Sequence, residues 1–405
     1  MNQQRIQALM ILSCVASCAE PRAHGPTCGT VPLTLEMGSP VVTLTLRAKD
    51  GTERPTRFLV DTGGGGLMLT EAVARELGLS VRLEETATEE GMRFAPMETP
   101  HIEIDGFALD LERARCAAVL DRESIMHGST PEGFLPGHVL ARHHVVFDYP
   151  GGRFTMGRPG TMKPLGEPVP SPIGSKSGFP RIEIGVGGTK QGFLLDTGAS
   201  FTMISITELE RWRAADANLP TMTGAVAEAN MVGGPMETDA LLMRVPELAW
   251  GPHSLRGVAA VSRPNGTFEK WMSSMMTDPI VGAIGGNVLR HFRVEIDYAS
   301  GTTYLQANTA DFATVLDGIG LVLGETAEGA HRVDALALVE GKPVCDGVEV
   351  GDLLRALDGR SLEGLAHRPV IELLRGKPGT PRTLTLERDG AAIERVVSSV
   401  RFLGL

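Results

Sequence analysis

An internal duplication constrains the fold of this 405-residue chain more than any other feature of its sequence. Three pairs of segments align: FLVDTGGGGLML at 58–69 with FLLDTGASFTMI at 193–204, PMET at 96–99 with PMET at 235–238, and GFLPGHVLARHHVVFDYPGGRFTM at 133–156 with GAIGGNVLRHFRVEIDYASGTTYL at 282–305. The shift between partners grows from 135 to 139 to 149 residues along the chain. Shifts that grow in one direction indicate two related lobes, the second with small insertions.

Short runs of Val, Leu, Ile and Thr alternate with clusters of Gly, Pro and Asp, a pattern typical of many short strands. The clearest runs lie at 41–46, 58–60, 101–104, 145–147, 182–186 and 193–195. Helical patterns are few, and the clearest lie at 71–77 and 207–213. We therefore expect a mainly β protein.

The ends of the duplicated halves suggest where the domains begin and end. The segment 158–178 is rich in Pro, Gly and Ser and predicts a linker. A new pattern begins near Asp311, which indicates a separate domain. The predicted organisation is a signal peptide at 1–18, a first lobe at 31–160, the linker with a second lobe at 161–308, and a C-terminal domain at 311–405.

Each half contains an Asp-Thr-Gly loop directly after an apolar strand. Asp61 and Asp196 lie at the strand ends, and Gly63 and Gly198 allow the backbone to turn tightly. If symmetry brings the loops together, the two carboxyl groups share one proton, because both cannot ionise cheaply side by side. The ionised member can then accept a proton from a water while the other polarises a substrate carbonyl, without a metal or other cofactor.

These features resemble the aspartic proteases, specifically the bacterial retropepsin-like group, with two lobes in one chain as in pepsin. The resemblance also rests on the Gly-hydrophobic-hydrophobic stretches at 133–135 and 282–284, and it covers about 31–308. It implies a two-lobed pepsin/retropepsin-like β-barrel fold. It also implies an endopeptidase in which Asp61 and Asp196 activate water to hydrolyse peptides or unfolded proteins.

The resemblance implies supporting roles in the two loops. The residues concerned are Thr62, Gly63, Thr197, Gly198 and Ser200. In the family the two threonines form hydrogen bonds across the lobes and brace the carboxyl pair. The first loop departs from the family, because Gly64 and Gly65 stand where the second loop has Ala199 and Ser200. We expect this loop to be looser, at some cost in preorganisation.

A hairpin flap covers the substrate in the family, and the repeat places the candidates near 91–96 and 231–235. Neither hairpin contains a tyrosine, unlike the flap of pepsins. Phe94 and Gly233 are the flap candidates, and a packing role for Phe94 is an equal alternative.

The C-terminal segment is similar to the PDZ domains of bacterial proteases. The resemblance rests on the loop Gly318-Ile319-Gly320-Leu321 and on DGVEVGDLLRALDG at 346–359. We expect a helix at 369–374, strands at 353–357, 383–387 and 393–397, and hairpin turns at Asp358-Gly359 and RDG. The resemblance implies that a peptide adds as an extra strand, with its terminal carboxylate on Ile319, Gly320 and Leu321. The alternative is a domain that only packs against the rest of the protein, or one that contacts a partner without binding a free C-terminus.

Charge and the N-terminal residues bear on partners and location. A net charge of -11 argues against nucleic acid or an anionic membrane surface as a partner. The first residues resemble a short secretory signal, and Val15-Ala16-Ser17-Cys18 resembles the bacterial lipoprotein signal. We therefore expect an exported envelope protein with lipid on Cys18, or otherwise a periplasmic or secreted one.

The remaining cysteines and histidines suggest no second catalytic centre. Cys28, Cys116 and Cys345 show no metal-binding spacing and are interpreted as structural. The histidines of the repeat, His143, His144 and His291, are interpreted as structural or exposed. The alternative function is a catalytically inactive, protease-fold lipoprotein of the envelope that binds peptides.

Overall fold

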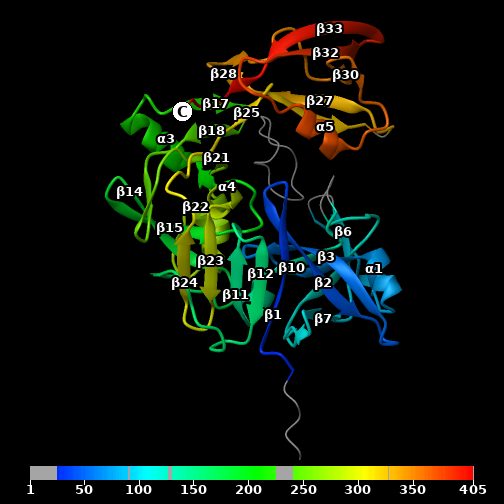
Figure 1. Ribbon diagram of the computed structural model, residues 1–405, viewed down its shortest axis with the longest axis vertical. Helices are drawn as coiled ribbons and strands as arrows, with labels where there is room; N and C mark the ends of the chain where they lie inside the picture. The colour runs from blue at the N-terminus through cyan, green and yellow to red at the C-terminus, as the bar shows by residue number, and fades with distance from the viewer. Residues whose placement is uncertain (1–24, 90–91, 126–129, 225–239, 327, 405) are drawn as a thin grey trace, which may run out of the picture.

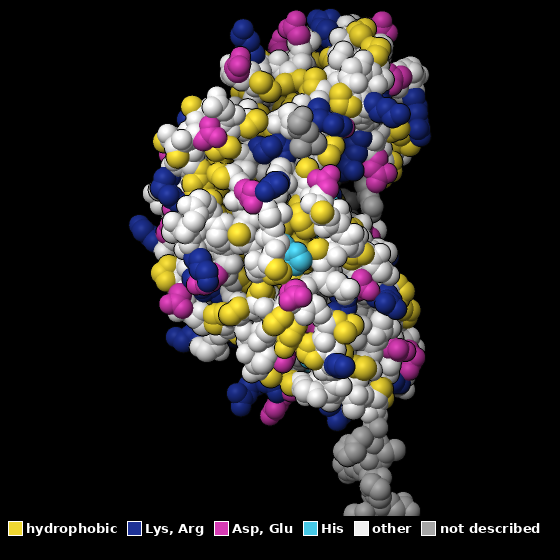
Figure 2. Space-filling view, turned by 60° about the vertical axis from the view of Figure 1, so that its left-hand side comes forward, with side chains coloured by type: hydrophobic (Ala, Val, Ile, Leu, Met, Phe, Trp, Pro, Cys, Tyr) yellow, Lys and Arg dark blue, Asp and Glu magenta, His cyan; other side chains and the backbone are white. Residues whose placement is uncertain are grey.

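The computed structural model describes residues 25–89, 92–125, 130–224, 240–326 and 328–404 (Figure 1). These residues are mainly β, as the sequence predicts, and they form two lobes and a C-terminal unit. Among them no helix has the length and apolar character needed to cross a membrane. Cys18 and the rest of the expected signal lie outside the described residues. Figure 2 shows acidic and basic side chains interspersed on the face that it draws.

The first lobe is built on a long, strongly curved sheet. Its strands are β1 (Cys28–Glu36), β2 (Ser39–Arg47), β3 (Glu53–Asp61), β4 (Leu67–Thr70), β5 (Ala87–Glu89), β6 (Met92–Pro96), β7 (His101–Ile104), β8 (Phe107–Ala108), β9 (Cys116–Val119), β10 (Gly133–Pro136), β11 (His144–Asp148) and β12 (Arg153–Gly157). Its α-helices are α1 (Glu71–Glu76) and α2 (Gly137–Leu140). Thr70 caps α1 by accepting a hydrogen bond from the amide of Val73, as expected for a helix that begins after a strand.

The second lobe repeats this arrangement, with most of its strands in a second sheet and its first strand and last two strands in the sheet that it shares with the first lobe. Its strands are β13 (Glu167–Pro170), β14 (Arg181–Val186), β15 (Thr189–Leu195), β16 (Met203–Ser205), β17 (Thr221–Thr223), β18 (Leu241–Arg244), β19 (Leu248–Trp250), β20 (His253–Leu255), β21 (Ala259–Arg263), β22 (Gly282–Ile284), β23 (Phe292–Asp297) and β24 (Thr302–Ala307). Its α-helices are α3 (Ile206–Ala215) and α4 (Gly286–Leu289). The strands and helices expected at 182–186, 193–195 and 207–213 are therefore present.

The two lobes meet in a shared sheet, where β11 pairs with β23 (Figure 1). The register maps onto itself under the 149-residue shift of the repeat, because His144 pairs with Asp297 and Asp148 pairs with Arg293. The central pair, Val146 and Glu295, is itself 149 residues apart. The approximate two-fold axis between the lobes therefore passes through this pair.

The segment expected to be a plain linker contains a strand. β13 pairs with β24 and extends the shared sheet at its edge. Val169 is buried there, while Pro168 and Pro170 flank it. Proline is tolerated on an edge strand, where one side of the backbone needs no partner. The prolines that indicated a linker are thus compatible with an edge strand.

The C-terminal unit is a small sheet with one helix. Its elements are β25 (Asp317–Gly318), β26 (Leu321–Glu325), β27 (His331–Leu336), β28 (Leu338–Val339), β29 (Lys342–Pro343), β30 (Leu353–Leu357), β31 (Arg360–Ser361), α5 (His367–Leu373), β32 (Pro381–Arg388), β33 (Ala391–Ser398) and β34 (Val400–Arg401). The main strand order is β26-β27-β30-β32-β33, and β28 pairs with β17 of the second lobe. The expected strands and hairpin turns are present, with positive φ at both Asp358 and Asp389. The helix begins two residues earlier than expected.

Candidate active site

Parallel strand pairs bring both Asp-Thr-Gly loops to the lobe interface. β3 runs parallel to β10, so that Asp61 lies opposite Pro136. β15 runs parallel to β22, and the amide of Asp196 donates to the carbonyl of Ile284 at 3.1 Å. The Gly-hydrophobic-hydrophobic segments of the repeat therefore support the loops, as the resemblance implies.

The carboxyl groups of Asp61 and Asp196 lie close enough to each other to perturb each other's pKa. Asp61 is partly buried and Asp196 is 9% exposed. The amide of Gly63 donates to Oδ1 of Asp61 at 2.7 Å, and the amide of Ala199 donates to Oδ1 of Asp196 at 3.0 Å. Two distant parts of the chain thus form one compact dyad held by backbone donors.

The environment of the dyad favours its protonated state. Burial, followed by the negative charge of Asp196, raises the pKa of Asp61 well above its ordinary value, although the amides of Gly63 and Gly198 oppose the shift. Burial also raises the pKa of Asp196, while its hydrogen bonds from Ala199 and Asp61 oppose that rise. The pair therefore retains a shared proton to higher pH than an isolated aspartate.

Thr62 and Thr197 brace the loops through reciprocal hydrogen bonds. The Thr62 hydroxyl donates to the carbonyl of Leu195 at 2.6 Å and accepts from the amide of Thr197 at 3.0 Å. The Thr197 hydroxyl donates to the carbonyl of Val60 at 2.8 Å and accepts from the amide of Thr62 at 3.1 Å. Both threonines are fully buried, so these bonds fix one loop against the other without competition from water.

Steric crowding explains why the first loop has a glycine at position 64. A Cβ on Gly64 would lie 2.3 Å from the Phe134 ring and 2.7 Å from Oδ2 of Asp61. The repeat places Ala283 where the first lobe has Phe134, and Ala199 where it has Gly64. Large and small residues are therefore exchanged between the lobes, and Phe134 fills the space that a side chain at position 64 would take.

Two other loop glycines differ in the space around them. A Cβ on Gly198 would lie 2.2 Å from Cγ of Asp61, so this position admits only glycine. A Cβ on Gly65 would meet no atom within 4 Å. Gly65 therefore faces open space and does not shape the dyad.

Within the described residues, Ser200 has no hydrogen bond to either carboxyl group, and it lines a different part of the structure. It follows the second loop and borders a cavity towards the C-terminal unit, and its carbonyl accepts from the amide of Asn287 at 3.0 Å. Ser39, which the sequence did not single out, instead donates its hydroxyl to the carbonyl of Gly198 at 2.8 Å. No sequence signal marked Ser39, because it is the first residue of β2 and not part of the repeated loop.

Two buried tyrosines lie near the dyad and were not recognised in the sequence as site residues. Burial, with a further contribution from the dyad charges, raises the pKa values of Tyr149 and Tyr298. They occupy equivalent positions of the repeat, in the DYPGG and DYASG segments. Their shared 149-residue shift was the signal that could have marked them.

The first flap candidate lies on a hairpin, and the second lies outside the described residues. Phe94 is on β6, which pairs with β5, and its side chain is half-buried. Its backbone pairs with Val119 on the other side. Gly233 and the segment 231–235 belong to the part of the chain that the structure does not describe.

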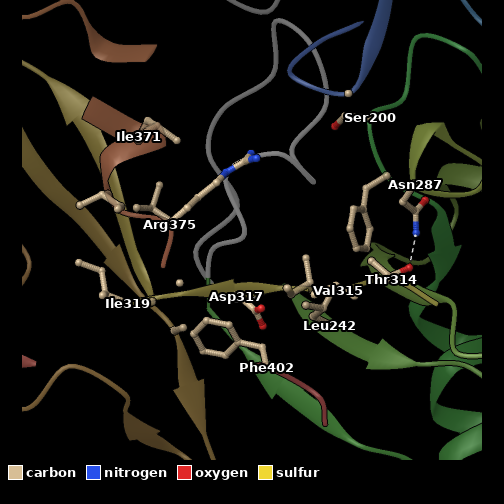
Figure 3. Close-up of a pocket in the computed structure, with 18 of the residues that line it drawn as sticks. Ser200, Leu242, Asn287, Thr314, Val315, Asp317, Ile319, Ile371, Arg375 and Phe402 are labelled. Atoms are coloured by element: carbon tan, nitrogen blue, oxygen red, sulfur yellow. Dashed lines mark hydrogen bonds between the residues drawn. The ribbon is translucent and has the colours of Figure 1, made fainter. Parts of the chain in front are cut away.

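A cavity of about 500 Å³ lies between the second lobe and the C-terminal unit (Figure 3). Residues 319–321, the expected peptide-docking loop, line it together with Ile371 and Arg375 of α5. Phe201 and Asn287 of the second lobe close the other side. Neither dyad carboxylate lines this cavity, so it is a separate site.

The other candidate residues have structural contacts. His144 Nε2 lies 2.7 Å from Oε1 of Glu295 in the shared sheet, and both side chains are 1% exposed. His143 Nδ1 lies 2.9 Å from the carbonyl of Val139. His291 packs edge-on against Phe312. The described cysteines, Cys28, Cys116 and Cys345, are not disulfide-bonded.

Comparison with known proteins shows a family similarity for one lobe. Residues 182–288 match the family model described as aspartyl protease, a segment that includes Asp196 and the supporting β22 strand. The crystal structure of an aspartic proteinase from Irpex lacteus is similar at 14% identity and a TM-score of 0.40, covering 71% of this chain and 98% of that one. No curated protein matched the sequence. The second lobe is thus similar to aspartyl proteases.

Proposed function

We propose that the protein is an aspartic-type endopeptidase whose dyad is Asp61 and Asp196. The observation that carries the proposal is the juxtaposition of two carboxyl groups with raised pKa values, in loops held by the reciprocal threonine bonds. The aspartyl protease match of residues 182–288 agrees with it.

The dyad divides the chemistry between its two members. The protonated member donates its proton to the carbonyl oxygen of the scissile peptide, while the ionised member accepts a proton from the attacking water. The water oxygen bonds to the carbonyl carbon and gives a neutral tetrahedral diol. Collapse of this diol breaks the C–N bond, transfers a proton to the leaving amine and releases a carboxylic acid and an amine. The dyad returns to its singly protonated state.

The test is cleavage of a mixed peptide library by the protein without residues 1–18, from acidic to neutral pH. Asp61→Asn and Asp196→Asn should each reduce turnover by more than a thousandfold, because one carboxyl group cannot act as acid and base together. Asp278→Asn, at an exposed aspartate, is the matched control and should retain full activity. Equal inactivity of all four proteins at every pH would leave the inactive peptide-binding alternative.

We also propose that the C-terminal unit is a PDZ-type domain that binds the free C-terminus of a peptide or protein. β26 is an edge strand of the described sheet and α5 contacts it, which leaves a place for an added strand. Arg375 and Lys377 border the cavity at residues 319–321 and favour an anionic end group. A fluorescent peptide with a free C-terminal carboxylate should therefore bind more tightly than the same peptide with a C-terminal amide. Equal affinities would contradict terminal capture.

A lipid anchor on Cys18 is proposed from the sequence alone. Expression in a bacterium that processes lipoproteins should place the wild-type protein in the membrane fraction, and Cys18→Ala should release it. Retention of Cys18→Ala in that fraction would contradict the proposal.

A further inference from the structure

Three metal-binding side chains converge at one end of the C-terminal unit. Glu325 is the last residue of β26, His331 is the first residue of β27 and His367 is the first residue of α5. Glu325 and His331 are direct cross-strand partners, and the rings of His331 and His367 have centroids 6.1 Å apart. One potential ligand atom from each side chain lies within 4.8 Å of the others. No function described above uses this cluster.

The hydrogen bonding of His331 prepares it to bind a metal. Its Nε2 lies 3.1 Å from the carbonyl of Leu365, and because a carbonyl can only accept, Nε2 must carry the proton. In the neutral ring Nδ1 is then unprotonated, and its lone pair can bind a metal ion. The residue is 3% exposed, and Nδ1 has no hydrogen-bond partner among the described residues. A buried acceptor without a partner is costly, and a backbone carbonyl that orients the opposite nitrogen is the usual second contact of a metal-binding histidine.

We propose that Glu325, His331 and His367 bind one Zn²⁺ ion. Two imidazoles and one carboxylate form a donor set that suits Zn²⁺, whereas Ca²⁺ and Mg²⁺ prefer oxygen ligands alone. His331 supplies Nδ1 from the interior and Glu325 supplies a carboxylate from the exposed rim. A water completes the four-coordinate site on the exposed side. Zn–N bonds of about 2.0–2.1 Å require the three ligand atoms to close in, and the exposed Glu325 side chain is free to make most of that movement.

The ion would join the start of α5 to the β26–β27 hairpin. The same helix and strand continue to the cavity, which Ile371 of α5 and Leu321 of β26 both border. His367 precedes Ile371 by one helical turn, and Glu325 follows Leu321 along the strand. If the groove binds peptides as proposed above, Zn²⁺ fixes its width at the end opposite residues 319–321. Linkage then requires peptide and Zn²⁺ to change each other's affinity by the same factor.

The test is zinc binding by the full-length protein without residues 1–18. The protein is purified without a polyhistidine tag and treated with a chelator to remove bound metal. Isothermal titration with Zn²⁺ should give one site per chain. Glu325→Gln and His367→Gln should each weaken binding at least tenfold, because each removes a ligand while leaving the buried His331 in place. His101→Gln is the matched control, because His101 is an exposed histidine 2.8 Å from Glu103 on the first lobe. It should bind Zn²⁺ like the wild type.

A spectroscopic readout separates this site from loose surface binding. X-ray absorption of the zinc-loaded chain should show two imidazoles and light-atom donors in the first shell, with one imidazole lost in His367→Gln. Zinc should also raise the melting temperature of the wild type but not of His367→Gln. Absence of a stoichiometric site, or equal binding by the wild type and both ligand variants, would overturn the proposal. These readouts need neither protease activity nor peptide binding.

Discussion

Gly64 and Phe134 form a size-matched pair beside the carboxyl group of Asp61. Gly64→Ala should lower kcat by about tenfold or more, because its Cβ would displace either the Phe134 ring or Asp61. Phe134→Ala in the same chain should restore much of the loss, since it recreates the Ala199–Ala283 arrangement of the second lobe. Gly65→Ala is the control and should leave kcat unchanged. Steady-state kinetics of the four proteins check this, and absence of rescue would contradict the pairing.

The dyad should also set how stability depends on pH. A carboxyl group whose pKa is raised by folding stabilises the native state at acid pH and loses that contribution as pH rises through the folded value. Both dyad pKa values are raised, mainly by burial, so the buried acidic pair costs the fold stability at neutral pH. Asp61→Asn leaves one ionisable carboxyl group in place of two and should raise the melting temperature at pH 7, with a smaller gain at pH 4. Calorimetry of the wild type and Asp61→Asn at pH 4 and pH 7 measures the change in melting temperature. A lower melting temperature of Asp61→Asn at pH 7 would contradict the prediction.

At the level of elements, each loop depends on a threonine from the other lobe. Thr62→Ala would leave the carbonyl of Leu195 and the amide of Thr197 buried without a partner, at about 1–3 kcal/mol for each group. Thr62→Ser keeps the hydroxyl and should lose much less. Chemical denaturation measures the free energy of unfolding of both variants. Equal stability of Thr62→Ala and the wild type would show that the bonds do not brace the loops.

The sequence predicted the strands and loops of the site where a local pattern occurs in both lobes. The strands at 58–60 and 193–195 and the loops after them followed from period and duplication, and so did the convergence of Asp61 and Asp196. The strand β13 was missed because its prolines indicate a linker until β24 is known to lie beside it. The Gly64–Phe134 exchange was missed for a related reason. It depends on two residues 70 positions apart that touch only through the parallel β3–β10 pairing.

For the whole molecule, the register of the shared sheet explains why two loops can form one site. The pairing of β11 with β23 is symmetric about Val146 and Glu295, so the same two-fold relation that aligns these strands also exchanges Thr62 with Thr197. The sequence contained the 149-residue shift but not the information that the two copies pair with each other. Such pairing depends on backbone hydrogen bonds, which leave little trace in side-chain patterns.

One arginine of the second lobe holds both ends of the C-terminal unit. The Arg244 guanidinium donates to the carbonyl of Thr314, just before the unit, and to that of Leu403, at its end, each at 3.2 Å. It also donates to the carbonyl of Gly257 within its own lobe. These bonds therefore help to fix the C-terminal unit against the second lobe. Sequence patterns could not reveal them, because the three carbonyls belong to the backbone.

Arg244→Met keeps much of the side-chain volume but removes all three donors, and it should loosen the C-terminal unit without disturbing the dyad. Amide hydrogen exchange should become at least tenfold faster in β25 and β34 and stay unchanged in β3 and β15, because only the former adjoin the lost bonds. Cleavage of short peptides should persist. Arg256→Met, at an exposed arginine paired with Glu247 on the same lobe, should show neither change. If amide exchange became equally faster in β3, Arg244 would support the lobe itself. If the exchange rates of β25 and β34 did not change, other contacts would suffice to fix the unit.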